Sequence, residues 1–143
     1  MSNAQTVQGL YEAFGRGDIA AIMEQMADAV EWEQWSDSHT GQDAGVPWLR
    51  RRSGKQGAAE FFQAVADTME FHSFEPQNIL EGRNQVAATI AFEATAKETG
   101  ERFRDEEIHL WTFDDAGKIV GMRHYVDTLK HIRAAIGTPV EAT

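Results

Sequence analysis

The second half of the chain constrains the fold most, because it holds four strand-like segments joined by very short turns. The segments cover 71–80, 85–96, 101–112 and 118–126, with breaks at Glu81-Gly82-Arg83, Thr99-Gly100 and Asp115-Ala116-Gly117. Turns of this length leave no room for a crossover helix, so neighbouring segments run antiparallel. The sequence therefore predicts an antiparallel meander.

The first half has the periodicity of helices. Apolar residues recur at helical spacing over 4–16, 19–27 and 55–69. A strand over 29–35 and a long polar loop over 36–53 separate the second helix from the third, and a brief helix over 129–136 ends the pattern. Three helices followed by a strand-rich half place the chain in the α+β class, with the helices on one face of a curved sheet.

Length and charge exclude several classes of function. With 143 residues, the chain is expected to form one domain over 1–143. Thirteen basic against 23 acidic residues give a net charge of −10, which disfavours nucleic acid as a partner. There is no cysteine for thiolate chemistry, and no apolar run of the roughly 18 residues that a membrane span requires. We therefore expect a cytoplasmic protein without a membrane or nucleic-acid partner.

Short motifs in both halves carry a resemblance to a known family. They are Tyr11-Glu12-Ala13-Phe14 with Gly17-Asp18, the segment from Val46-Pro47 to Gly54, His109-Leu110-Trp111, and Gly117-Lys118-Ile119-Val120 running on to Tyr125-Val126-Asp127-Thr128. In this order, over residues 6–132, the chain resembles the SnoaL-like, ketosteroid-isomerase-related proteins of the nuclear transport factor 2-like (NTF2-like) superfamily. The resemblance implies a cone-shaped, cystatin-like fold in which a curved antiparallel sheet wraps on three N-terminal helices around an open apolar pocket. It also implies a homodimer formed through the sheet.

The resemblance also suggests site residues. The proton-shuttling aspartate of ketosteroid isomerases corresponds to Glu33, at the end of the first strand. Their oxyanion-binding tyrosine falls on Leu10, beside Tyr11, and their protonated aspartic acid falls on His109. SnoaL-like cyclases are similar at the last strand instead, where an aspartate acts as general base near a histidine, and Asp127 with His109 matches that pattern.

Strand pairing predicts a polar face independently of the family. Gly117 suits the left-handed position of a three-residue hairpin loop, so Asp114 should face Lys118. Alternation then places four opposed pairs on one face: Trp111 with Gly121, His109 with Arg123, Glu107 with Tyr125, and Asp105 with Asp127. If this face lines a pocket, the opposed aspartates raise the pKa of one carboxyl and make it a suitable base.

Two alternatives remain open at this stage. The opposite strand face is more apolar, so the polar set could face solvent instead; that apolar face holds Ile108, Leu110, Val120, Met122 and Val126. A four-residue loop would bring His109 onto one face with His124, and only that register would allow a metal bound by both histidines and a carboxylate. The predicted register implies no metal.

Together these observations favour a cofactor-independent isomerase- or cyclase-type enzyme that transfers protons on a small apolar carbonyl compound. Asp127 is the predicted base and His109 its partner, with Asp105 and Glu33 as further catalytic candidates. Predicted substrate contacts are Tyr11, Trp32, Trp35, Trp48, Glu107, Trp111, Arg123 and Tyr125. The alternative is a non-catalytic small-molecule binding protein of the same fold, which an exposed Asp127 would favour. An epoxide hydrolase fits less well, because its full set of water-binding carboxylate, arginine and second acid is not evident.

Overall fold

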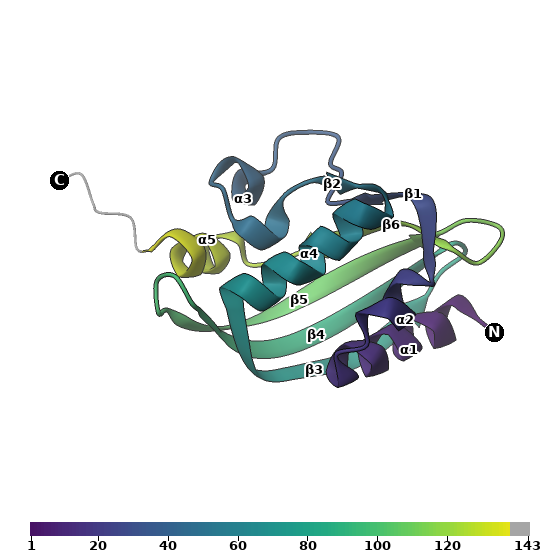
Figure 1. The fold of residues 1–143 in the computed structure, drawn as a ribbon, viewed down its shortest axis with the longest axis horizontal. Coiled ribbons are helices and arrows are strands. Elements are labelled where there is room, and N and C mark those ends of the chain that lie inside the picture. The colour runs from purple at the N-terminus through teal and green to yellow at the C-terminus, as the bar shows by residue number, and fades with distance from the viewer. Residues whose placement is uncertain (138–143) are drawn as a thin grey trace.

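A six-stranded sheet covered on one face by helices forms the body of the protein (Figure 1). The structure is a computed structural model and describes residues 1–137. The spatial order of the strands is β2-β1-β6-β5-β4-β3. The strands are β1 (Met26–Trp32), β2 (Arg52–Ser53), β3 (Met69–Glu81), β4 (Gln85–Ala96), β5 (Arg102–Phe113) and β6 (Ile119–Tyr125). The predicted α+β class is confirmed.

The helices α1 and α4 lie over the inner face of the sheet (Figure 1). The helical elements are α1 (Asn3–Arg16), α2 (Ile19–Met23), α3 (Thr40–Asp43), the short 3-10 helix η1 (Pro47–Leu49), α4 (Gly54–Thr68) and α5 (Thr128–Ile136). A capping box at Ser2 begins α1, because Ser2 Oγ accepts from the Gln5 amide and Gln5 Oε1 accepts from the Ser2 amide. The expected long loop contains α3, η1 and β2, so it is more ordered than its composition predicts.

The predicted meander is confirmed for β3 to β6, which pair as antiparallel neighbours. β1 begins at Met26, before the predicted strand over 29–35, and α2 is shorter than the predicted helix over 19–27. That helix ends at Met23, because Met26 already begins β1 and lies opposite Ile119 of β6. β1 runs parallel to β6, with Trp32 opposite Met122. This long-range pairing outweighs the helical pattern of the local sequence.

The polar face of β5 points inward. Along β5, buried residues alternate with more exposed ones. The buried residues, which point inward, are Phe103, Asp105, Glu107, His109, Trp111 and Phe113. Ile108, on the outward and more apolar face, is 41% exposed. On this strand the prediction of an inward polar set is correct, and the reading in which that set faces solvent is wrong.

The pairing predicted between β5 and β6 is wrong beyond the turn. The turn itself has the expected form, because the Asp114 amide donates to the Lys118 carbonyl at 2.8 Å and Gly117 has φ of 80°. Val120 is then an extra residue on β6, a β-bulge that shifts the register by one. The observed pairs are Thr112 with Gly121, Trp111 with Met122, Leu110 with Arg123, His109 with His124 and Ile108 with Tyr125. The bulge reverses the facing of β6, so Arg123 and Tyr125 leave the inner face and Met122 and His124 replace them.

The expected pair of opposed carboxylates, Asp105 and Asp127, is likewise not formed. Asp127 is the N-cap of α5, and its side chain is exposed. Its backbone amide donates to Asp105 Oδ2 at 3.1 Å. Asp105 Oδ2 also accepts from His131 Nε2 at 2.7 Å, and Asp105 Oδ1 accepts from the Glu106 amide at 2.8 Å. Asp105 therefore joins β5 to α5 as a buried structural acceptor.

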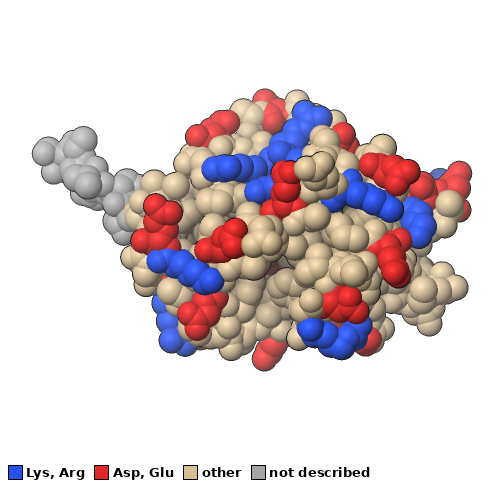
Figure 2. Space-filling model, in the orientation of Figure 1, with Lys and Arg blue, Asp and Glu red and all other residues tan. Residues whose placement is uncertain are grey.

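The surface shown in Figure 2 carries acidic and basic side chains interspersed with one another. No large area of a single sign covers this face, although the chain has a net charge of −10. Among residues 1–137, every helix is too short or too polar to cross a lipid bilayer.

Replacing Asp105 with alanine tests the link between β5 and α5. The variant leaves the His131 ring and two backbone amides without their shared acceptor, so we expect the free energy of unfolding to fall by about 2 kcal/mol or more. Urea denaturation measures the change. Glu106→Ala, at the exposed neighbouring position, is the control and should change stability by less than about 0.5 kcal/mol. Equal effects in the two variants would show that Asp105 does not hold α5 in place.

Candidate functional site

A cavity lies between the helices and the inner face of the sheet, and aromatic side chains form most of its wall. It contains about 650 Å³ of empty space, including the part that opens to solvent. Its aromatic lining consists of Tyr11, Phe14, Trp32, Trp48, Phe61, Phe62, Phe71, Phe74, Phe92 and Trp111. Only four further polar side chains, Glu107, His109, His124 and His131, reach this wall. The cavity is therefore apolar with a small cluster of ionisable groups on one side.

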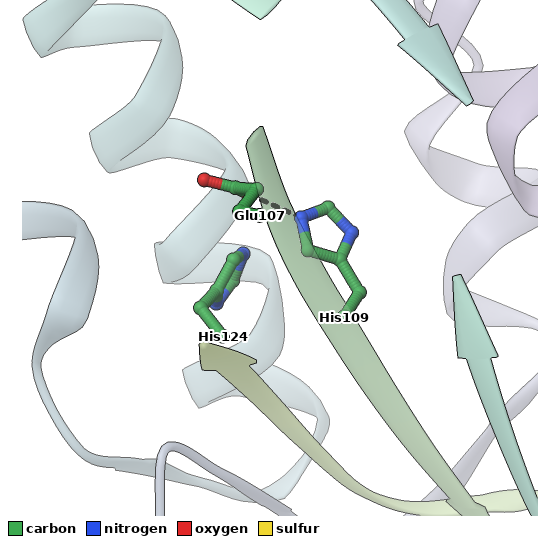
Figure 3. Close-up of side chains that lie close together, drawn as sticks. All are labelled: Glu107, His109 and His124. Atoms are coloured by element: carbon green, nitrogen blue, oxygen red, sulfur yellow. Dashed lines mark hydrogen bonds and ion pairs between the residues drawn. The ribbon is translucent and has the colours of Figure 1, made fainter. Parts of the chain in front are cut away.

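The first part of this cluster is a hydrogen-bonded chain that starts at an indole and ends at a carboxylate. Trp111 Nε1 donates to the Tyr11 hydroxyl at 3.0 Å, and that hydroxyl is 2.8 Å from His109 Nδ1. His109 Nε2 contacts Glu107 Oε2, the interaction drawn in Figure 3. Because an indole N–H can only donate, the Tyr11 proton is free to point at His109 Nδ1. The His109 proton then lies on Nε2, facing the carboxylate of Glu107.

The second part of the cluster is His124, held from behind by Glu33. Glu33 Oε1 accepts from both the backbone amide and Nδ1 of His124, each at 2.6 Å, and Glu33 Oε2 accepts from Trp35 Nε1 at 3.1 Å. Glu33 is fully buried and has φ of 57°, a left-handed conformation that is uncommon outside glycine. With Nδ1 engaged, His124 Nε2 is left without a hydrogen-bond partner among residues 1–137. It is the atom with which His124 can meet a ligand.

The two histidines lie edge to face across the β5–β6 pair, with ring centroids 4.6 Å apart, yet they favour opposite charge states. Burial lowers the pKa of His109, and the nearby His124 lowers it further, against the opposing effect of Glu107. Burial also disfavours the charged form of His124, but the hydrogen bond and negative charge of Glu33 outweigh it and raise the pKa of His124. The arrangement favours a neutral His109 beside a cationic His124.

Glu107 and Tyr11 complete the electrostatic picture. Burial acts to raise the pKa of Glu107, but the hydrogen bond with His109 and the positive charge of His124 lower it overall, so the group is a carboxylate. Burial raises the pKa of Tyr11, which keeps the phenol protonated. Glu107 Oε1 is 3.7 Å from His131 Nε2, beyond hydrogen-bond distance, and has no other partner among the described residues. One oxygen of this buried carboxylate is thus unengaged at the cavity wall.

His131 closes the cluster on the side of α5. Trp48 Nε1 donates to His131 Nδ1 at 2.9 Å, so that nitrogen carries no proton. The proton of the ring therefore lies on Nε2 and is donated to Asp105. Both ring nitrogens of His131 are engaged, which indicates that the residue supports the wall of the cavity.

Six of the predicted site residues line the cavity, and six do not. The six at the wall are Tyr11, Trp32, Trp48, Glu107, His109 and Trp111. Glu33 and Asp105 are buried behind the wall, each bonded to a histidine that reaches it. The expected placement of Trp35, Arg123, Tyr125 and Asp127 at the pocket is wrong.

The β6 bulge and the end of β1 explain three of these displacements. Arg123 lies on the outer face, where its guanidinium is 4.8 Å from the centre of the Trp35 ring and its Nε donates to the Gln34 carbonyl at 2.7 Å. Tyr125 packs edge-on against the same ring, with centroids 5.1 Å apart. Trp35 thus organises an outer cluster, and its contribution to the site is indirect, through the hydrogen bond to Glu33.

Sequence reasoning missed several residues of the wall. The most important is His124, which the alternative four-residue loop would have placed on the face of His109. The structure reaches that facing through a bulge instead. His131 could have been found from its helical spacing to Ala134, because the two form the buried stripe of α5. Phe71, Phe74 and Phe92 come from strands whose facing was not assigned.

The same cluster contains two groups with the composition of a metal site. One potential ligand atom from each of Glu107, His109 and His124 lies within 4.8 Å of the others, and the same is true of Asp105, Glu107 and His131. In both groups, however, members bond to one another, His109 to Glu107 and His131 to Asp105. These contacts engage His109 Nε2 and His131 Nε2, whereas Glu107 Oε1 and His124 Nε2 stay without a partner among the described residues.

Comparison with known proteins agrees with this architecture. The sequence matches the family of SnoaL-like domains over residues 7–122. No curated protein shows significant similarity to the chain. An NTF2-like protein of unknown function from Burkholderia pseudomallei is 25% identical, with 95% of this chain and 99% of that chain aligned at a TM-score of 0.78.

Two further solved structures carry provisional activity names. A protein from Mesorhizobium loti, provisionally named a SnoaL-like polyketide cyclase, is 25% identical over 87% of this chain and 99% of that chain, with a TM-score of 0.67. A provisionally named isomerase from Rhodopseudomonas palustris is 18% identical over 92% of this chain and 93% of that chain, with a TM-score of 0.68, and shows the fold alone. The fold is NTF2-like, and the match over residues 7–122 shows that the chain belongs to the family of SnoaL-like domains.

Proposed function

We propose that the protein is an isomerase- or cyclase-type enzyme that transfers protons on a small, largely apolar carbonyl compound without a cofactor. One observation carries the proposal: Glu107 and His124 each present an unengaged polar atom to the same apolar cavity. One carboxylate oxygen of Glu107 and one ring nitrogen of His124 lie within 4.8 Å of each other. A base and an acid are thus close enough to act on neighbouring atoms of one substrate.

The roles follow from the charge states. Glu107, as the carboxylate, removes a proton from the carbon next to the carbonyl through Oε1, and the C–H electron pair forms the new C=C bond of the enol. His124, as the cation, gives its Nε2 proton to the carbonyl oxygen, so no free oxyanion is left in the apolar cavity. In a substrate with a C=C bond between its β- and γ-carbons the product of this step is a dienol; Glu107 then returns its proton to the γ-carbon, the C=C bond moves into conjugation, and the enol O–H gives its proton back to His124 as the C=O bond re-forms. His109 and Tyr11 position Glu107 through the hydrogen-bonded chain.

These assignments replace Asp127 as the base, because its carboxylate is exposed at the N-cap of α5. That exposure is also the observation that favours the second candidate, a non-catalytic binding protein using the same cavity. The two candidates differ in one respect: only the enzyme speeds up removal of a proton from a carbonyl compound.

Exchange of the α-protons of 2-tetralone in D₂O, followed by ¹H NMR, tests the proposal. This bicyclic aryl ketone has acidic α-protons and the apolar character of the cavity. We expect exchange above the buffer rate with the wild type, and a rate at least about 100-fold lower with Glu107→Gln, which keeps the shape of the side chain but loses its charge.

Asp127→Asn is the matched control, and we expect it to exchange the ketone at the wild-type rate. Equal rates with wild type and Glu107→Gln would rule out Glu107 as the base. Binding of 2-tetralone without exchange above the buffer rate would contradict the proposed enzyme and favour the non-catalytic binding protein.

We also propose a homodimer through the outer face of the sheet, the face turned away from α1 and α4. Three large apolar side chains on this face are exposed in the single chain: Leu80 at 60%, Ile108 at 41% and Tyr125 at 42%. Light scattering after size-exclusion chromatography should give twice the chain mass for the wild type and the single-chain mass for Ile108→Lys. Leu129→Lys, at an exposed position of α5, should remain a dimer. A wild-type monomer would refute the proposal.

A further inference from the structure

Trp32 carries the one fully buried side-chain nitrogen or oxygen without a hydrogen-bond partner among the residues that the structure describes. The side chain is 1% exposed, and the orphaned atom is the indole Nε1. A buried donor that has left water without gaining a new acceptor is a cost to the folded state, and such groups are rare. The lack of an acceptor for Trp32 Nε1 therefore requires a physical explanation.

The three other indoles of the chain each have an acceptor. Trp35 donates to Glu33, Trp48 to His131 and Trp111 to Tyr11, at 3.1, 2.9 and 3.0 Å. Two of these, Trp48 and Trp111, line the cavity as Trp32 does. The fold thus supplies partners to the neighbouring indoles and leaves Trp32 without one.

Trp32 belongs to the same part of the wall as the proposed acid. Its ring packs against Phe61 with centroids 4.9 Å apart, and Phe61 packs against His124 at 5.3 Å. Trp32 also lies opposite Met122 in the β1–β6 pair, two residues before His124. A ligand that fills the cavity beside Phe61 therefore lies against the wall to which the Trp32 ring and His124 both belong.

We propose that the Trp32 indole N–H is a hydrogen-bond donor for an oxygen atom of the ligand, and that it makes the cavity select planar carbonyl compounds over hydrocarbons of the same shape. The inference rests on the proposed use of the cavity as a ligand site and deepens it by naming a selecting atom. An aromatic wall alone distinguishes such compounds poorly. A buried donor does so because a hydrocarbon leaves it unpaired, whereas a carbonyl oxygen satisfies it.

Two probes of nearly equal shape test the proposal, 2-acetonaphthone and 2-isopropenylnaphthalene. They differ only in that one has a C=O group where the other has a C=CH₂ group. The ratio of their dissociation constants therefore measures the contribution of the carbonyl oxygen to binding. Isothermal titration calorimetry gives this ratio for the wild type and for Trp32→Phe, which removes the N–H and keeps an aromatic ring. We expect the preference for the ketone to be about fivefold to tenfold smaller in Trp32→Phe, the worth of one neutral hydrogen bond.

Trp48→Phe is the matched control, because Trp48 lines the same cavity but its N–H is already bonded to His131. It should keep the wild-type ratio. A ratio that is the same in wild type and Trp32→Phe, or a wild type that binds neither probe, would overturn the proposal.

Two further measurements separate this inference from the proposed reaction and from any folding defect. In ¹H–¹⁵N spectra of the wild type, the Trp32 indole signal should move downfield with the ketone and not with the hydrocarbon; a signal indifferent to the ketone would overturn the proposal without any variant. Glu107→Gln should keep the ketone preference even though it loses exchange of 2-tetralone. Loss of the preference in Glu107→Gln and not in Trp32→Phe would assign the selection to Glu107 and refute the role of Trp32.

Discussion

Glu33 is a buried carboxylate with both oxygens paired, and this pairing determines the rest of the site. Glu33 follows directly after β1, is 0% exposed and accepts three hydrogen bonds, two of them from His124. Its left-handed backbone turns the side chain toward β6 while its amide bonds to the Met122 carbonyl. The cost of this conformation is offset by the paired charge, and the result fixes both the position and the charge of His124.

The chemistry of the cavity depends on a few charged groups set in an apolar wall. Aromatic rings exclude water from most of the wall, which strengthens every remaining electrostatic interaction. In that setting two histidines with ring centroids 4.6 Å apart cannot both be charged at low cost. Glu33 favours the charge on His124, whereas the hydrogen-bonded chain through Tyr11 leaves His109 neutral and directed at Glu107. The neutral ring of His109 thus contacts both the anion, Glu107, and the cation, His124, that proton transfer requires.

Much of this architecture could be predicted from the sequence, and the exceptions have physical causes. The short turns predicted the meander, and alternation along β5 predicted that Glu107 and His109 share one face, which the structure shows to be the inward one. The bulge at Val120 and the parallel pairing of β1 with β6 could not be predicted, because no local sequence pattern indicates either of them. One extra residue on β6 was enough to exchange Arg123 for His124 at the site. Asp127 was misassigned for a related reason, since its place in the motif does not distinguish a strand residue from the N-cap of the next helix.

The most direct test of this account is a pH titration of the ring signals of His109 and His124 by NMR, in the wild type and in Glu33→Gln. We predict that His124 titrates above the ordinary value of 6.5 and His109 below it, and that loss of the Glu33 charge lowers the midpoint of His124. The stabilisation from the His124–Glu33 pair is then fully present below pH 6.5 and is lost as the pH rises through the raised pKa of His124. The stabilisation from burying a neutral His109 has the opposite dependence: it is present above pH 6.5 and is lost as the pH falls through the lowered pKa of His109. Titration of both rings near 6.5, unchanged in Glu33→Gln, would contradict the account.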